Sequence, residues 1–153
     1  LEEIGRRQDV DIIPMGGIKD GIDTVKSLAL GADAIGMGTP AIIAAGCIAC
    51  MQCHVGTCVV GIATQDPDHE KRYQVDIEAQ NAARFFESVR WQIAALTHAL
   101  GYDDIRKLGR DDLVALTPEA AAITKLPYAP EHRAGEHQIQ ETVGIQRSGS
   151  HIQ

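Results

Sequence analysis

The chain has 153 residues, of which 44% are hydrophobic and 23% charged, and its net charge is −7. This composition is typical of a globular domain, and a negative charge without a dense block of Lys and Arg argues against a nucleic-acid or membrane-surface partner. No apolar run approaches the roughly 20 residues needed to cross a bilayer. The sequence begins at Leu1 without an initiator Met or a signal-peptide pattern, so we expect a processed chain or an excerpt from a longer one.

The first predicted elements form a strand–helix–strand unit. The segments 11–15 and 34–37 are short apolar runs that predict buried strands. Between them, Asp20 is a good N-cap for a helix, and Gly31 is placed to end it. A strand, a helix and a second strand in this order imply that the two strands are parallel.

Glycine turns follow both predicted strands, at Gly16-Gly17 and at Gly36-Met37-Gly38-Thr39. Glycine lets the backbone approach an oxyanion, and a helix with Thr39 as N-cap and Pro40 as its first residue would direct free N–H groups at it. In a TIM barrel, the loops after strands 7 and 8 form the usual phosphate site. We therefore predict a phosphate site here, with ordinary tight turns as the alternative.

The four cysteines of the chain all lie within one short loop, as Cys47, Cys50, Cys53 and Cys58. Thiolates are soft ligands that suit iron–sulfur clusters or zinc. Disulfides and free thiols are the alternatives, but small disulfide-rich domains usually spread their cysteines along the chain. The loop therefore predicts a metal centre in a reducing compartment, and we expect a cytoplasmic protein.

A long helix is predicted at about 76–100, because apolar residues recur there every three or four positions until Gly101. Its aromatic residues Phe85, Phe86 and Trp91 are predicted to be core. Residues 129–153 are polar and without periodicity, which predicts a largely disordered tail.

The predicted fold class is α/β, with the chain forming about strands 7 and 8 of a TIM (β/α)₈ barrel, then the metal-binding cysteine loop and a long helix. A complete barrel takes about 250 residues. Two strands cannot close it, so we expect the remainder upstream of Leu1, with a partner chain as the alternative source. We expect a division into 1–116, which includes the loop 46–66, and an extension, 117–153.

The stretch from Gly16 to Thr39, the cysteine loop and the segment 60–67 resemble the C-terminal end of the glutamate synthase FMN-binding domain, over about residues 9–115. The resemblance implies a (β/α)₈ barrel that binds FMN and a 3Fe–4S cluster whose cysteines are six and then five residues apart. By that match the cluster ligands are Cys47, Cys53 and Cys58. The residues that fall where the family holds the FMN phosphate are Gly16, Gly17, Gly36, Gly38 and Thr39.

Cys50 is additional to the family's common pattern. With it the spacing could hold a fourth iron, so a 4Fe–4S cluster is an alternative, as is a structural role for Cys50 as a small buried hydrophobe. This variant is similar to the shorter archaeal-type glutamate synthases and to N-methylglutamate synthase subunits. His54, between the cysteines, is expected to donate a hydrogen bond to the cluster rather than to ligate it.

The resemblance implies that the chain is part of a glutamate synthase. Electrons from a reduced ferredoxin or a pyridine-nucleotide-oxidising subunit would pass through the cluster to FMN, and hydride would reduce 2-iminoglutarate, formed from 2-oxoglutarate and ammonia, to glutamate. The expected partners are an amidotransferase and the electron donor, in an oligomeric enzyme. The family's substrate residues lie on earlier strands, so we identify no catalytic residue and expect the chain alone to be inactive. The rival hypotheses are an N-methylglutamate synthase subunit and, of another class, a zinc-stabilised Cys₄ interaction module.

Overall fold

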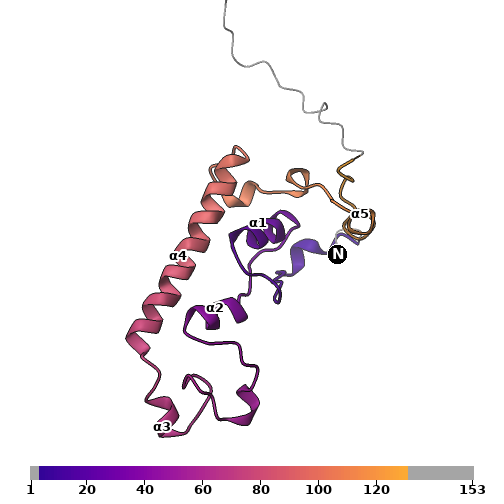
Figure 1. The fold of residues 1–153 in the computed structure, drawn as a ribbon. Coiled ribbons are helices and arrows are strands. Elements are labelled where there is room, and N and C mark those ends of the chain that lie inside the picture. Colours follow the sequence, from indigo (N-terminus) through magenta and orange to yellow (C-terminus); the bar gives the residue numbers. More distant parts are fainter. Residues whose placement is uncertain (1–3, 131–153) are drawn as a thin grey trace, which may run out of the picture. The chain divides into compact units, whose positions relative to one another are not determined.

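The computed structural model describes residues 4–130, which are mostly helical (Figure 1). Its α-helices are α1 (Gly21–Ala29), α2 (Thr39–Ala44), α3 (Pro67–Glu70), α4 (Val75–Ala99) and α5 (Pro118–Thr124). Single turns of 3₁₀-helix are η1 (Arg7–Asp9), η2 (Cys53–Val55), η3 (Ile105–Lys107) and η4 (Arg110–Asp112). The chain divides into two compact units, with the boundary between Leu113 and Val114.

Helix α1 has the limits that its sequence predicts. The Oδ1 atom of Asp20 accepts a hydrogen bond from the N–H of Asp23 at 2.9 Å, which confirms the N-cap. At the other end, Gly31 has a φ of +103° and the N–H of Ala32 donates to the carbonyl of Ser27 at 3.1 Å. This is the glycine-based Schellman end that satisfies the last carbonyls of a helix.

The two predicted strands do not form as strands in the described residues. They are extended segments joined by a single parallel bridge, Met15–Gly36, and by the hydrogen bond from the N–H of Gly36 to the carbonyl of Pro14 at 3.0 Å. The parallel direction is as predicted, but the strand length is not. Two short segments without a third strand beside them are marginal as a sheet, because parallel strands depend on neighbours and on helices covering both faces.

An ion pair holds the first extended segment against the end of α1. Arg7 donates to Asp33 Oδ2 and to the carbonyl of Gly31, both at 2.6 Å. The same Asp33 oxygen accepts the N–H of Ile12 at 2.7 Å. The Ile12 N–H and then the Arg7 guanidinium lower the pKa of the Asp33 carboxyl below its ordinary value. This network fixes the segment around Ile12, just before the parallel bridge, against the residues that follow α1.

Helix α4 is the element on which both α1 and α2 pack (Figure 1). It spans nearly the predicted range and ends at Gly101, which has a φ of +86°. The contact with α1 is closest at Gly21, where a Cβ atom would lie 2.5 Å from the Cβ of Gln92. The N–H of Gly21 also donates to Gln92 Oε1 at 2.9 Å. Val25 and Ala29 of α1 and Val89 of α4 are buried, so this pair of helices holds most of the first unit's small core.

The prediction that the aromatic residues of α4 are core is wrong for two of them. Trp91 is 72% exposed and Phe86 is 46% exposed, while Phe85 is half-buried. Helical periodicity shows which residues share a face, but it does not show how wide a stripe the neighbouring helices cover. Here α1 and α2 cover only part of the apolar surface of α4.

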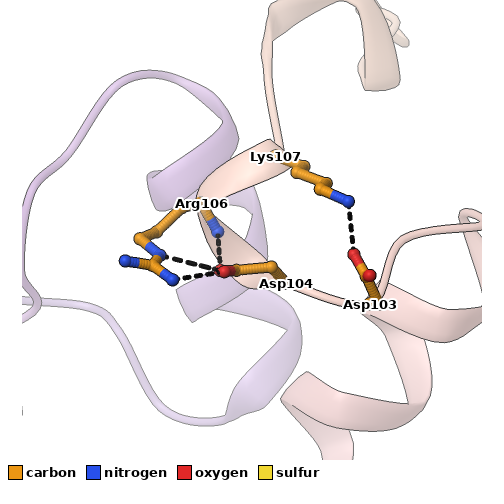
Figure 2. A network of polar contacts seen from close by, with 4 residues as sticks. All are labelled: Asp103, Asp104, Arg106 and Lys107. Atoms are coloured by element: carbon orange, nitrogen blue, oxygen red, sulfur yellow. Dashed lines mark hydrogen bonds and ion pairs between the residues drawn. The ribbon is translucent and has the colours of Figure 1, made fainter.

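The segment after α4 folds back through a cluster of ion pairs, which Figure 2 shows. Asp104 is the N-cap of η3 and accepts from both the backbone and the guanidinium of Arg106. The side-chain hydrogen bond from Arg106, followed by its backbone N–H, lowers the pKa of Asp104 to about 2. Lys107 pairs with Asp103 beside it. Since η3 contacts α1 and α4, this cluster shapes a turn that packs on the helix pair.

The second unit contains α5, and a bridge between residues on either side of this helix joins the ends of the segment. Thr117 is the N-cap, accepting the N–H of Ala120 at 3.1 Å. Ala115 and Tyr128 form a parallel bridge, and Ala115 is buried. The predicted disordered tail falls, apart from its first residues, outside the described residues. None of the helices in the described part of the chain is long and apolar enough to cross a membrane.

Replacing Gly21 with Ala should destabilise the protein, because the new methyl group would overlap Gln92 and the backbone of α4. Overpacking of this kind typically costs about 1–3 kcal/mol. Chemical denaturation should show the loss in the free energy of unfolding. Gly109→Ala is the matched control, since a Cβ atom at Gly109 would meet no atom within 4 Å. An equal effect of the two substitutions would contradict the close α1–α4 contact.

Replacing Asp104 with Asn should lower the melting temperature at neutral pH. The pKa of Asp104 in the folded protein lies below its ordinary value of 3.8. The ionised carboxylate therefore stabilises the fold above pH 3.8. This contribution is lost as the pH falls through about 2. The difference in melting temperature between the variant and the unsubstituted protein should therefore shrink as pH falls below 3.8. Asp103→Asn, which removes only an exposed pair with Lys107, should have a smaller effect. A difference that does not change with pH would contradict this assignment.

Candidate functional site

The glycine turns predicted as a phosphate site lie around one cavity of about 330 Å³. The parallel bridge Met15–Gly36 brings the two turns together, although α1 separates them in the sequence. All five predicted residues line the cavity: Gly16, Gly17, Gly36, Gly38 and Thr39. The structure thus assembles the predicted residues in one place, and their binding of a phosphate stays a prediction.

The first turn needs glycine for its backbone conformation. Gly16 and Gly17 have φ angles of +91° and +73°, a region that side chains other than glycine rarely adopt. Both residues are exposed, and a Cβ atom at either would meet no atom within 4 Å. The turn therefore leaves its backbone open to a ligand.

The second turn differs from its prediction by one residue. Gly38, not Thr39, is the N-cap of α2, because the carbonyl of Gly38 accepts the first helical hydrogen bond, from the N–H of Ile42 at 3.0 Å. Thr39 is the first helical residue and its side chain caps nothing. Thr39 and Pro40 still line the cavity, so the start of α2, where the first N–H groups have no helical partner, belongs to the site.

Lys19 is a cavity residue that the sequence analysis did not select. It lies two residues after the Gly-Gly turn and contributes to the cavity lining together with the apolar Ile18 and Ile43. A lysine ammonium is a common partner of phosphate groups, while the apolar residues would exclude water. The sequence signal that could have identified this cavity residue is the position of a lysine just after a Gly-Gly turn.

Cys47 is fixed at the far end of the same short helix that begins at this cavity. Its N–H donates to the carbonyl of Ile42, and the N–H of Gly46 donates to the carbonyl of Ile43, both at 3.0 Å. With Gly46 at a φ of +91°, this is the two-bond Schellman end of α2. The helix therefore connects the glycine turns to the first cysteine without an intervening flexible loop.

Gly46 also lies directly under a side chain of α4. A Cβ atom at Gly46 would be 2.7 Å from Cδ of Glu78, whose Oε2 accepts a hydrogen bond from Asn81 at 3.1 Å. Helix α4 thus holds the beginning of the cysteine loop. No motif or spacing in the sequence indicated this contact, because the two residues are distant along the chain.

The four thiols have different environments. Cys58 is buried, Cys47 is half-buried, and Cys50 and Cys53 are exposed. Cys50 lies between Ala49 and Met51, which have φ angles of +54° and +62°; such angles are strained for residues with side chains. Within residues 4–130, no three His, Cys, Asp or Glu side chains lie close enough together to hold a metal ion. The predicted ligand set, Cys47, Cys53 and Cys58, is therefore not gathered in the structure and stays a prediction.

Cys58 lies in a turn in which the N–H of Gly61 donates to the Cys58 carbonyl at 3.1 Å. Hydrogen bonds from backbone N–H groups lower the pKa of the Cys58 thiol below its ordinary value, while burial acts in the opposite direction. The donors, in decreasing order of effect, are Ala63, Val60, Ile62 and Gly61. These donors favour the thiolate, which is the form that binds metals.

The residues present fit an iron–sulfur cluster in their chemistry. Four thiols occur on one loop, and the pKa of one of them, Cys58, lies below its ordinary value, which favours the thiolate that such clusters need. A Cys₄ zinc site would draw on the same thiols. The exposed Cys50 does not fit a buried structural role, so that interpretation of Cys50 is wrong for the described structure.

A second, open cavity of about 580 Å³ adjoins the cysteine loop and is lined by Cys53, Gly56 and residues 62–66. His54 is exposed beside it. His69 has a buried Nδ1 atom, 3.9 Å from Asp66 Oδ2. The loop contacts α3 at Gly61, where a Cβ atom would lie 2.5 Å from the carbonyl oxygen of His69, and it contacts α4 at Gly46.

Comparison with known proteins gives a family match over most of the first unit. The model of the conserved region in glutamate synthase matches residues 1–103. The archaeal-type glutamate synthase [NADPH] of Thermotoga neapolitana is 40% identical over 108 residues, which are 71% of this chain and 21% of that protein.

Two other relatives also have glutamate synthase in their names. A glutamate synthase large subunit-like protein of Rhizobium meliloti is 32% identical over 145 residues, covering 84% of this chain and 33% of the relative. The ferredoxin-dependent glutamate synthase of Cyanidium caldarium is 36% identical over 115 residues, covering 74% of this chain and 7% of the relative. The chain thus spans between about a fourteenth and a third of the lengths of these relatives.

If the cysteine loop binds iron as predicted, replacing Gly46 with Ala in the full-length protein should lower both stability and bound iron per chain. A left-handed backbone costs a residue with a side chain about 1–2 kcal/mol, and the strain here lies at the residue before Cys47. Gly101→Ala is the matched control, because Gly101 has a φ of +86° at the equivalent end of α4 and a Cβ atom there would meet no atom within 4 Å. The control should lose similar stability in thermal unfolding and keep its iron. Equal iron contents in the two variants would contradict a role for Gly46 in placing Cys47.

Proposed function

Because this chain belongs to the glutamate synthase family, we propose that it forms the cluster-binding and flavin-phosphate-binding end of an FMN-dependent glutamate synthase. The complete enzyme would be an oxidoreductase acting on the CH–NH₂ group, which forms glutamate from 2-oxoglutarate and ammonia. The family implies a TIM-barrel-type α/β fold, and we propose that residues 1–116 are the part around strands 7 and 8 and that 117–153 are an extension.

One observation carries the proposal: the glycine cavity and Cys47 lie at opposite ends of α2. The cavity includes the start of this helix at Thr39, and the Schellman turn at its other end fixes Cys47. Six residues of α-helix rise about 9 Å, so a phosphate group and a metal centre would be neighbours. Neighbouring cofactor sites are what an electron-transferring flavoenzyme requires.

On the flavin side, we propose that the phosphate is held by the backbone of Gly16 and Gly17 and by the start of α2. The open left-handed turn and the free N–H groups of a helix start both favour an oxyanion. Lys19 would supply the positive charge, and Ile18 and Ile43 would shield the group from water. Each of these side chains lines the cavity.

On the metal side, we propose Cys47, Cys53 and Cys58 as the ligands of a 3Fe–4S cluster, with Cys50 as the additional ligand if the cluster is 4Fe–4S. When bound, the cluster and FMN would supply one-electron transfer and hydride delivery to the imine of 2-oxoglutarate. The chain's own contribution is positional: α2 holds one ligand and the backbone donors around Cys58 stabilise another as a thiolate. Tuning by such donors is how proteins set cluster potentials.

The partners proposed for the whole enzyme are an amidotransferase, which would supply ammonia, and a ferredoxin or a pyridine-nucleotide-oxidising subunit as electron donor. Relatives named for NADPH and for ferredoxin both match this chain. We further propose an oligomeric enzyme.

The direct test is to assay the full-length purified protein, supplied with reductant and 2-oxoglutarate, for product with ammonia and separately with methylamine. Glutamate from ammonia supports the proposal. N-methylglutamate formed preferentially from methylamine would reassign the chain to N-methylglutamate synthase. A colourless protein with zinc and no activity would identify a zinc-stabilised interaction module instead.

Single Cys→Ser variants of the full-length protein test the ligand assignment. Cys47→Ser, Cys53→Ser and Cys58→Ser should each lose most of the bound iron and the visible absorption of the cluster, because serine oxygen is a harder and poorer ligand for iron–sulfur clusters than thiolate. Cys50→Ser is the matched control from the same loop and should keep a 3Fe–4S cluster. Loss of iron in Cys50→Ser alone would overturn the assignment.

A further inference from the structure

The start of α1 follows closely on the Gly-Gly turn of the candidate phosphate site. Ile18 and Lys19, which both line the cavity, are the residues between Gly17 and the N-cap Asp20. Ile18 is buried, with 8% of its surface exposed. Because so little chain intervenes, a shift of the helix start would move the backbone that borders the cavity.

Local hydrogen bonds order this helix start. The N–H of Lys19 donates to Asp23 Oδ2 at 3.3 Å, and the N–H of Asp23 donates to Asp20 Oδ1 at 2.9 Å. The hydroxyl of Thr24 donates to the carbonyl of Asp20 at 2.9 Å. These bonds join residues of one short segment, so they set the shape of the segment but not its position relative to the rest of the first unit.

Gln92 of α4 binds this segment from outside. Its Oε1 atom accepts the N–H of Gly21 at 2.9 Å, across 71 positions of the sequence. The approach is close, because a Cβ atom at Gly21 would lie 2.5 Å from Cβ of Gln92, 2.9 Å from the carbonyl oxygen of Val89 and 3.0 Å from the nitrogen of Ile93. The first N–H groups of a helix have no partner within it. Gln92 therefore satisfies one of these groups and ties the start of α1 to α4.

The Gly-Gly turn has few contacts of its own. Gly16 and Gly17 are exposed, and a Cβ atom at either would meet no atom within 4 Å. On one side the turn is held by the parallel bridge Met15–Gly36. On the other side the chain reaches the hydrogen bond between Gly21 and Gln92. The turn thus lies between these two attachments, and the second of them depends on a single side chain.

We infer that Gln92 is a positioning residue for the flavin phosphate: by holding the N–H of Gly21, it keeps the Gly-Gly turn and Lys19 in the arrangement that receives the phosphate group. This inference rests on the proposed flavin site. Gln92 is not among the residues that line the cavity, so it acts through the start of α1. A site that takes its binding arrangement for only a fraction of the time loses apparent affinity in proportion to that fraction.

The test compares FMN with riboflavin, which has the same ring system but no phosphate. The affinity of the flavin-free full-length protein for each is measured by the quenching of flavin fluorescence. Gln92→Leu removes the acceptor and keeps a side chain of similar size. It should lower the affinity for FMN about tenfold, as the fraction of ordered turn falls, and leave the affinity for riboflavin unchanged. General destabilisation of the fold would lower both affinities together.

Gln80→Leu is the matched control, because Gln80 is an exposed glutamine of the same helix. It should keep both affinities. Gln92→Asn is a milder variant for the case in which Gln92→Leu does not fold. It keeps an amide group but is one methylene shorter, so the bond to Gly21 should weaken and the ratio of FMN to riboflavin affinity should fall in the same direction. Thermal unfolding shows which variants are folded.

Folded Gln92 variants with an unchanged ratio of FMN to riboflavin affinity would overturn the inference and leave the proposed function standing. The same result would follow if Gln80→Leu lowered the ratio as much as the Gln92 variants. An unsubstituted protein that binds FMN no more tightly than riboflavin would instead overturn the proposed phosphate site itself.

Discussion

The close packing of α4 against α1 and α2 is the constraint on which the rest of the first unit depends. It is possible because glycines lie at the contacts: Gly21 lets α1 approach the backbone of α4, and Gly46 fits beneath Glu78. The first contact fixes the helix between the two extended segments, and with it the glycine turns around the cavity. The second fixes the end of α2, where the cysteine loop begins. One helix without a predicted functional residue thus holds both halves of the candidate site in place.

The cysteine loop is anchored at its two ends and exposed between them. Cys47 is held by the Schellman end of α2, and Cys58 by the closed turn that rests on α3. Cys50 and Cys53 lie on the exposed stretch between these anchors. The two anchored ends of the loop determine where the cysteines lie relative to the glycine cavity. The exposed stretch between them contributes two further thiols and has few packing contacts. The six-and-five spacing places Cys53 near the middle of the loop and leaves the additional Cys50 on its strained part.

Features decided by neighbouring residues could be predicted from the sequence. The cap at Asp20, the glycine ends at Gly31 and Gly101 and the extent of α4 are all local, and the structure confirms them. The two glycine turns were also recognised as a set, since a parallel pair necessarily places its ends together. Strand formation was not predicted correctly, because a strand depends on partners beyond its own residues. Contacts between residues distant in the sequence, such as Gly46 with Glu78 and Gly61 with His69, produce no periodicity or motif in the sequence. The parts of the site that depend on these contacts could therefore be identified only from the structure.

The central claim is that the glycine cavity and the cysteine loop are two halves of one electron-transfer site. The most direct measurement is the content of iron, acid-labile sulfide, zinc and FMN in a single anaerobic preparation of the full-length protein. The account predicts one FMN with about three irons per chain, or about four if Cys50 is also a ligand, and no stoichiometric zinc. A protein that contains zinc in place of iron and binds no FMN would contradict it.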